Sequence, residues 1–412
     1  MSLLTLSLAY IRARALSSAL NLLLLALGVG TIVLLLLFGA QLGERLTRDA
    51  RGIDLVIGAK GSPLQLVLSA VYHADFPTGN IPLAEAERWA SHRLVAQAIP
   101  VALGDSLAGF RIVGTEHGYA EHYGAALAAG RLWQAPFEAT LGAAVAAATG
   151  LGVGDRFVGS HGLAPGGPAH GEHAYSVVGV LAPSASVLDR LVLTPVASVW
   201  QVHGLAGPEH EQQDEEEDGE EHAHEAQHTD PRRAITALLI RYASPVAAVQ
   251  LPLAVNQESA LQAASPAFET ARLLSLVGVG LDTLRGFGAL LIASAGLSVF
   301  IALWNAMQER RYELAVLRLL GASRGALLAQ PLLEGLLLAG AGALLGLALG
   351  HGVAELLGRL LRPAQSLGLS GMVWLPGEVY VVLLALAVGA LAALLPALQA
   401  WRTDIAAVLA TR

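Results

Sequence analysis

Apolar residues are concentrated in four long runs, one near the N-terminus and three in the C-terminal third of the chain. The runs cover residues 16–40, 286–308, 326–350 and 379–400, and their interiors carry almost no charge. An α-helix rises about 1.5 Å per residue, so about 20 apolar residues cross the hydrocarbon core of a bilayer. Each run reaches that length. The pattern predicts an α-helical membrane protein with four transmembrane helices in a 1+3 layout.

The segment between the first two runs, residues 41–285, alternates short apolar stretches with Gly/Pro turns. Stretches at residues 83–94 and 142–150 predict helices. The increasingly apolar stretch 256–284 predicts a helical stalk that leads into the second span. Runs typical of β-strands lie at residues 53–57, 110–114, 175–181, 191–199 and 237–242. We therefore expect a large α/β domain inserted between the first and second spans.

The distribution of arginine predicts which side of the membrane each segment occupies, because short Arg-rich segments stay on the cytoplasmic side. Eight arginines lie in three short segments, namely the amphipathic N-terminal segment 1–15, the segment 309–325 and the tail 401–412. The loop 351–378, on the other side of the membrane, holds only two. We therefore expect both termini in the cytoplasm. Residues 41–285 would then lie outside it, in the periplasm, with the chain in a bacterial inner membrane.

Composition narrows the chemistry that this chain can perform. Hydrophobic residues make up 54% and charged residues 14%, as expected if lipid surrounds part of the chain. The net charge of −8 argues against nucleic acid as a partner. The chain has no Cys, and its only Lys, Lys60, precedes a Gly rather than following it as in a phosphate-binding P-loop. Since no catalytic constellation is recognisable, we expect neither enzymatic activity nor a cofactor bound by this chain.

Residues 209–230, EHEQQDEEEDGEEHAHEAQHTD, contain no apolar residue except Ala and are predicted to form a disordered loop. One interpretation is a solvated acidic linker. The other is weak capture of Zn²⁺ or another divalent metal, because imidazole and carboxylate groups are ligands for such ions. The histidines that would take part are His210, His222, His224 and His228.

The third span carries two features of its own. Gly342, Gly346 and Gly350 recur at four-residue spacing, which predicts a face where another helix approaches closely. Glu334 lies inside the same span, where an acid is a candidate for a functional role such as a proton relay. Because Glu334 is near the cytoplasmic end, we favour a structural ion pair with Arg324 or another inner arginine.

Residues 309–325 predict a short amphipathic helix at the cytoplasmic face. Glu309 and Glu313 come early and Arg318 late, which suits the helix dipole, and Gly321 is a natural helix end. Its apolar stripe consists of Leu314, Leu317 and Leu320. Such a helix either lies on lipid headgroups or docks into a groove of a partner protein.

Residues 309–338, ERRYELAVLRLLGASRGALLAQPLLEGLLL, resemble the signature of the FtsX-like permease domain. Residues 396–412, PALQAWRTDIAAVLATR, are similar to the terminal motif of that domain. The 1+3 layout resembles the MacB-type, or type VII, ABC transporter permeases, and stretches such as 110–115 and 152–155 look like their periplasmic core domain. Unlike full-length MacB, this chain has no fused nucleotide-binding domain.

The resemblance implies a permease subunit that works with a separate cytoplasmic ATPase, two permease copies pairing with two ATPase subunits. ATP-driven closure would move the outer domains through the stalks, which is called mechanotransmission. The resemblance assigns contact with the ATPase to the short helix, namely to Glu309, Arg310, Arg311, Glu313, Leu314, Leu317, Arg318 and Gly321.

Several kinds of cargo are compatible with the sequence. The His-rich tract, together with residues 58–80, favours a connection with metal homeostasis. The alternatives are lipoprotein release or peptide efflux, with a periplasmic adaptor or substrate protein as a further partner. From a different class comes an FtsX-like regulator, which would switch a periplasmic enzyme without transporting anything.

The metal hypothesis predicts that residues 209–228 carry the Zn²⁺ affinity of the chain. Calorimetric titration of the purified protein with Zn²⁺ should show binding that disappears when these residues are deleted, because the histidines and carboxylates are removed together. If the intact and the shortened protein bind Zn²⁺ equally, the tract is a solvated linker.

Overall fold

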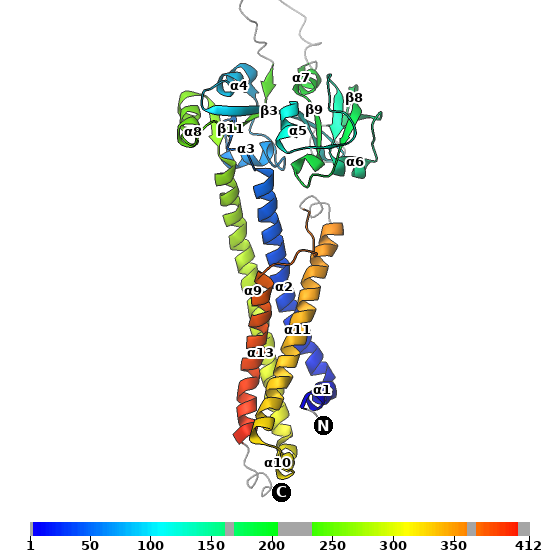
Figure 1. Ribbon diagram of the computed structural model, residues 1–412, viewed down its shortest axis with the longest axis vertical. Coiled ribbons are helices and arrows are strands. Elements are labelled where there is room, and N and C mark those ends of the chain that lie inside the picture. Colours follow the sequence, from blue (N-terminus) through cyan, green and yellow to red (C-terminus); the bar gives the residue numbers. More distant parts are fainter. Residues whose placement is uncertain (1–2, 161–168, 205–232, 361–367, 403–412) are drawn as a thin grey trace, which may run out of the picture. The chain divides into compact units, whose positions relative to one another are not determined.

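A computed structural model describes residues 3–160, 169–204, 233–360 and 368–402 (Figure 1). The chain divides into two compact units. Residues 1–43 and 275–412 form a helical unit, and residues 44–274 form an α/β domain. This division agrees with the layout predicted from the apolar runs.

Four helices of the described chain are long and apolar enough to cross a membrane, which confirms the predicted 1+3 layout. They are α2 (Ala15–Asp49), α9 (Pro266–Glu309), α11 (Arg324–Leu360) and α13 (Gly377–Arg402). Two short helices accompany them, α1 (Leu3–Ala13) before the first span and α10 (Arg311–Leu319) between the second and the third. Because α2 and α9 include residues of both units, each enters or leaves the α/β domain without a break in the helix.

Glycines allow the backbones of these helices to approach closely. A Cβ added to Gly346 of α11 would lie 2.5 Å from Val29 Cβ and 2.9 Å from the carbonyl oxygen of Ala26, both on α2. Gly342 and Gly350 face Leu25 and Val33 of α2 in the same way. The predicted glycine face is therefore the surface of α11 that α2 covers, with Val29 and Val33 fully buried between the two helices.

The α/β domain is built on a ten-stranded sheet of order β12-β1-β11-β3-β4-β9-β6-β8-β5, in which β7 pairs with β3 and β8. Most neighbours are antiparallel, but β4 and β9 pair in parallel, as do β6 and β8. The strands are β1 (Leu55–Ala59), β3 (Val95–Leu107), β4 (Phe110–Thr115), β5 (Leu127–Gly130), β6 (Glu138–Leu141), β7 (Arg156–Ser160), β8 (Ala169–Leu181), β9 (Leu191–Pro195), β11 (Ala237–Tyr242) and β12 (Leu261–Ala264). A separate two-stranded sheet pairs β2 (Ile81–Pro82) with β10 (Ala234–Ile235).

Helices cover the sheet and enclose two apolar cores. One core gathers around Leu55, Trp89, Leu238 and Leu251, and the other around Ile112, Leu141, Val177 and Val192, all of them nearly or fully buried. The helices are α3 (Pro63–Ala70), α4 (Leu83–Ala90), α5 (His117–His122), α6 (Ala143–Thr149), the 3₁₀ helix η1 (Val187–Arg190), α7 (Val196–Gly204) and α8 (Ala247–Glu258). Since the chain lacks cysteine, no disulfide supports this domain, and its stability depends on burial in these cores.

The structure corrects three boundaries. The predicted stalk 256–284 is not one helix, because β12 forms within it and pairs with β1, and only α9 from Pro266 onward is helical. The predicted strand 191–199 ends at Pro195, and α7 begins at the next residue, Val196. The predicted outer loop 351–378 starts too early, since α11 continues to Leu360.

Tight packing on α11 makes a testable prediction. Replacing Gly346 by Ala should destabilise the helical unit by about 1–3 kcal/mol, because the new methyl group would overlap Val29 and the Ala26 carbonyl group. Thermal unfolding of the purified protein in detergent measures the effect. The matched control is Gly352→Ala on the same helix, where the added Cβ would meet nothing within 4 Å. Equal melting temperatures for the two variants would contradict the assigned contact.

Candidate functional site

Residues 309–321, to which the resemblance assigns contact with the ATPase, have one buried and one exposed face. Leu314 of α10 is 2% exposed and lies in a cluster with Ala306 and Met307 of α9, while Leu317 packs against the same cluster. Leu319 and Leu320 are instead 62% and 79% exposed. Two of the three leucines of the predicted stripe thus hold α10 in place, and the third is available for contact.

The end of the helix is well defined. Leu320 caps α10, and Gly321 follows with φ +98°, a conformation that residues with a Cβ rarely adopt. Tyr312 and Glu313, from the first turn, are also exposed. The exposed set therefore includes residues at both ends of α10, with the exposed leucines next to its C-terminus.

Polar contacts tie this segment to α1 and to α11. Glu309, the last residue of α9, pairs with Arg14. Arg310, which precedes α10, lies over the ring of Tyr10 at 3.4 Å from the ring centroid. The same Arg310 forms an ion pair with Glu334 of α11 at 3.9 Å, and both side chains are nearly buried. Glu334 therefore forms the ion pair expected with an arginine of this end of the chain, and that arginine is Arg310 rather than Arg324.

Tyr10 and Arg14 were missed by sequence reasoning. Each belongs to the N-terminal segment, far in sequence from residues 309–313, and no local pattern connects them. The basic and aromatic residues ahead of the first span were the available signal. The packing of the helices brings Tyr10 next to Arg310 and Arg14 next to Glu309.

A second polar cluster lies inside the α/β domain, where α2 enters it and α9 leaves it. The hydroxyl of Tyr72 donates a hydrogen bond to the carbonyl oxygen of Leu46 on α2 at 3.1 Å. Since that hydroxyl has one proton, it accepts the hydrogen bond from Thr270 of α9, at 2.5 Å. One buried side chain therefore joins the domain ends of both helices.

The chain of contacts continues from the next residue, His73. Its Nε2 lies 2.9 Å from the hydroxyl of Tyr119 on α5. Tyr123, whose ring packs against Tyr119, donates from its hydroxyl to the carbonyl oxygen of Asp49 at 2.8 Å. Asp49 also faces Arg45 at 3.8 Å and Arg190 at 3.9 Å. These groups connect α2 to α5 and η1.

Burial controls the charge of His73. It lowers the pKa of the imidazole to about 3, and the positive charges of Arg111 and Arg190 add to the effect. Burial also raises the pKa of the Tyr119 hydroxyl, so the His73–Tyr119 pair is neutral at ordinary pH. His73 has φ +52° as well, which is uncommon for a residue with a side chain.

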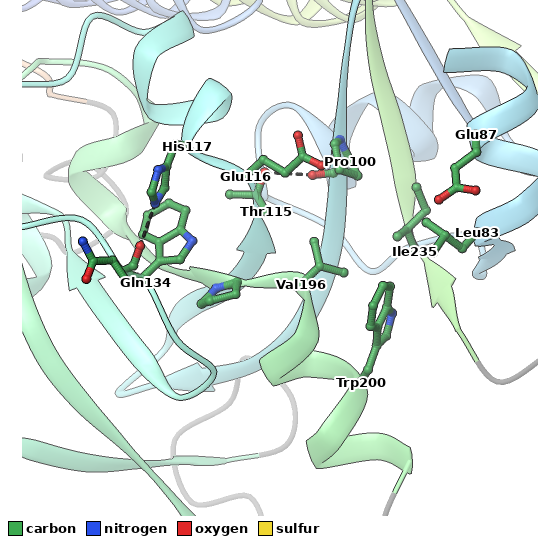
Figure 2. Close-up of a pocket in the computed structure, with 12 residues that line it drawn as sticks. Leu83, Glu87, Pro100, Thr115, Glu116, His117, Gln134, Val196, Trp200 and Ile235 are labelled. Carbon is green, nitrogen blue, oxygen red and sulfur yellow. Dashed lines mark hydrogen bonds between the residues drawn. The ribbon is translucent and has the colours of Figure 1, made fainter. Parts of the chain in front are cut away.

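A cavity of ≈ 430 Å³ opens on the same domain (Figure 2). Apolar side chains from α4, β3, β9, α7 and β10 line it, namely Leu83, Pro100, Pro195, Val196 and Ile235. Trp133 and Trp200 contribute indole rings. Figure 2 shows Glu87, Glu116 and His117 around this lining, and both carboxylates are exposed.

Among the residues that the structure describes, no group of three or more His, Asp or Glu side chains could hold a metal ion. The four histidines of the candidate metal tract, His210, His222, His224 and His228, lie outside the described residues. The metal hypothesis therefore stays a prediction.

Two protein-family models match the chain. The model of the MacB-like periplasmic core domain matches residues 18–266, which is more than half of the chain. The model of the FtsX-like permease C-terminal domain matches residues 285–405. No curated protein sequence matches the chain at a significant level.

Solved structures were also compared. The periplasmic region of MacB from Actinobacillus actinomycetemcomitans is 12% identical, with a TM-score of 0.35, and the match covers 55% of this chain and 97% of that one. The extracellular domain of the ABC-type transporter YknZ from Gram-positive bacteria is also 12% identical, with a TM-score of 0.30, covering 51% of this chain and 98% of that one.

The neutral state of His73 predicts how the α/β domain responds to acid. In the unfolded chain His73 takes up a proton below about pH 6.5, whereas in the folded chain it does so only near its lowered pKa of about 3. The contribution of neutral His73 to the free energy of unfolding is therefore complete above pH 6.5 and decreases as pH falls towards 3. The loss should approach about 1.4 kcal/mol per pH unit. Replacing His73 by Asn, which tolerates positive φ, should remove this part of the pH dependence.

Hydrogen exchange of the full chain at about pH 7.5 and about pH 5, corrected for the intrinsic rate, measures this through the protection of β1 and β11. We expect wild type to lose more protection between the two conditions than the variant. An equal loss in both proteins would show that other groups carry the acid sensitivity.

Proposed function

Because the chain belongs to the type VII ABC permease family, with a MacB-like periplasmic core domain and an FtsX-like permease domain, we propose that it couples ATP hydrolysis by a separate cytoplasmic ATPase to movement of its α/β domain. The observation that carries this proposal is α10, a short helix anchored by its buried face and bearing exposed leucines next to a glycine end. Such a helix can place its exposed apolar side chains in a groove of another protein.

The contacts around α10 explain how a push on it would reach the long helices. Leu314 is packed against the end of α9, so displacement of α10 displaces α9. The ion pair of Arg310 with Glu334 links the same segment to α11, and Arg14 with Glu309 links it to the N-terminal end of α2. Buried apolar groups resist separation, and a buried ion pair is costly to break by removing one partner.

Movement would then pass along α2 and α9, the two helices that include residues of both units. A continuous helix transmits displacement along its axis because its hydrogen bonds lie in that direction. At the domain end of each helix, Tyr72 contacts Leu46 and Thr270, so a change in the relative position of α2 and α9 would strain one buried side chain.

The proposal includes a location and partners. We propose that the chain lies in a bacterial inner membrane with its termini in the cytoplasm, where an ATPase can reach α10, and that two permease copies assemble with two ATPase subunits. The absence of a P-loop in the sequence agrees with hydrolysis on another polypeptide.

Positions at the C-terminal end of α10 supply the test. Replacing Leu320 by Ser should lower co-purification of the ATPase from native membranes roughly fivefold or more, because truncating a side chain that dominates an interface costs about 1 kcal/mol or more. Arg318→Glu should have a similar effect through charge reversal. The matched control is Leu360→Ser, at the other end of α11, where the leucine is 69% exposed.

Quantitative mass spectrometry of the purified complexes measures the ratio of ATPase to permease, and the ATPase activity of the same samples measures coupling. Undiminished co-purification and stimulation with Leu320→Ser would refute the assigned interface. Loss with the Leu360→Ser control as well would indicate a general folding defect.

A further inference from the structure

The segment that leads into α13 is uncharged and carries exposed apolar side chains. Residues 368–377, Gly-Leu-Ser-Gly-Met-Val-Trp-Leu-Pro-Gly, which we call the strap, contain no Asp, Glu, Lys, Arg or His. Within the strap, Met372 is 78% exposed, Val373 39% and Trp374 70%. Three consecutive apolar side chains therefore face away from the protein.

The backbone of the strap is hydrogen-bonded from its inner side. Gln41 of α2 donates from Nε2 to the carbonyl oxygen of Ser370 and accepts at Oε1 from the N–H of the same residue, both at 2.8 Å. Glu355 of α11 accepts from the N–H of Gly371 at 3.0 Å. His351 Nδ1 lies 2.6 Å from the carbonyl oxygen of Gly371, and because a carbonyl group only accepts, this nitrogen donates.

The end of the strap is held by α13 and by the same histidine. Glu378, in the first turn of α13, accepts at Oε1 from the N–H of Leu375 at 3.0 Å, and its Oε2 lies 3.0 Å from His351 Nε2. The ring of Trp374 packs against the imidazole, with the two ring centroids 4.4 Å apart. The side chains of Glu378 and His351 are only 4% and 11% exposed. The polar groups that hold the strap thus lie inside, and its apolar side chains lie outside.

This division suits the boundary between lipid headgroups and acyl chains. A backbone N–H or carbonyl group near the hydrocarbon core needs a partner within the protein, because lipid offers none. Gln41, Glu355, His351 and Glu378 supply such partners to an irregular segment. Tryptophan also prefers this boundary, because its ring has both an apolar body and a polar N–H group.

The neighbouring surface identifies lipid as the partner of the strap. The next element, α13, begins at Gly377 and is one of the four helices long and apolar enough to cross a membrane. Val379 and Tyr380 in its first turn are 60% and 74% exposed, and Leu383 is 55% exposed. The exposed apolar positions of the strap therefore lead directly into those of a membrane-spanning helix, interrupted only by the buried Glu378.

We propose that the strap is an anchor in the lipid leaflet away from the cytoplasm, with Met372, Val373 and Trp374 at the boundary of headgroups and acyl chains. Through the two hydrogen bonds of Gln41, the same anchor holds α2, which continues into the α/β domain. The anchor does not depend on the ATPase, and it takes from the proposed function only the side of the membrane.

Spin labelling of single-cysteine variants tests the anchor with the full-length protein in vesicles of phosphatidylcholine. Because the chain has no Cys, a nitroxide label reaches only the introduced residue. Labels at Met372→Cys and Trp374→Cys should collide more often with O₂, which is apolar and concentrates in lipid, than with the water-soluble complex NiEDDA. The ratio of the two collision rates should approach that of Leu383→Cys, the exposed reference position on α13.

The matched control is Val249→Cys, because Val249 is apolar and 73% exposed but belongs to α8 of the α/β domain. Its label should show the low ratio of an aqueous site, and unchanged far-ultraviolet circular dichroism should show that all variants fold. A ratio at the strap as low as at Val249 would overturn the proposal. Low collision rates with both reagents would also overturn it, because protein, such as a second copy of the chain, would then cover the strap in place of lipid.

Discussion

The close contact of α2 with the glycine face of α11 is the interaction on which the helical unit depends. In lipid, no hydrophobic effect drives helices together, so their association depends on van der Waals contact and on the few polar groups they share. Gly342, Gly346 and Gly350 let the backbone of α2 come near enough for its Leu25, Val29 and Val33 to fill the interface. The same principle holds between α11 and α13, where Gly335 and Gly389 face each other's backbone carbonyl groups.

A few polar contacts join the long helices to one another and to the shorter elements. Asn21 and Ser298 join α2 to α9 by a hydrogen bond of 2.5 Å. At one end of the helical unit, Arg310 contacts both Tyr10 and Glu334. Within the α/β domain, Tyr72 contacts the domain ends of α2 and α9. Buried polar groups that find partners favour one arrangement over others, since an alternative arrangement leaves them unsatisfied.

The exposed surface at the C-terminal end of α10 is the site that we propose for contact with the ATPase. Its exposed leucines end a helix whose other face is packed inside the protein, as suits a lasting contact with another subunit.

Local sequence determined the elements whose signals are strong within one segment. Four apolar runs, the amphipathic residues 309–325, Gly321 as a helix end and the strand 237–242 follow from periodicity, length and the conformational freedom of glycine. Tertiary structure decided the rest. Residues 261–264, Leu-Gln-Ala-Ala, lack β-branched side chains, and they form a strand because β1 offers its free edge and Leu261 is buried in the core. The pairings of Arg310 with Tyr10 and of Tyr72 with Leu46 and Thr270 join segments far apart in sequence, and so does the cavity at Trp200. No local pattern specifies such contacts, because they arise only when separate elements bury their faces against each other.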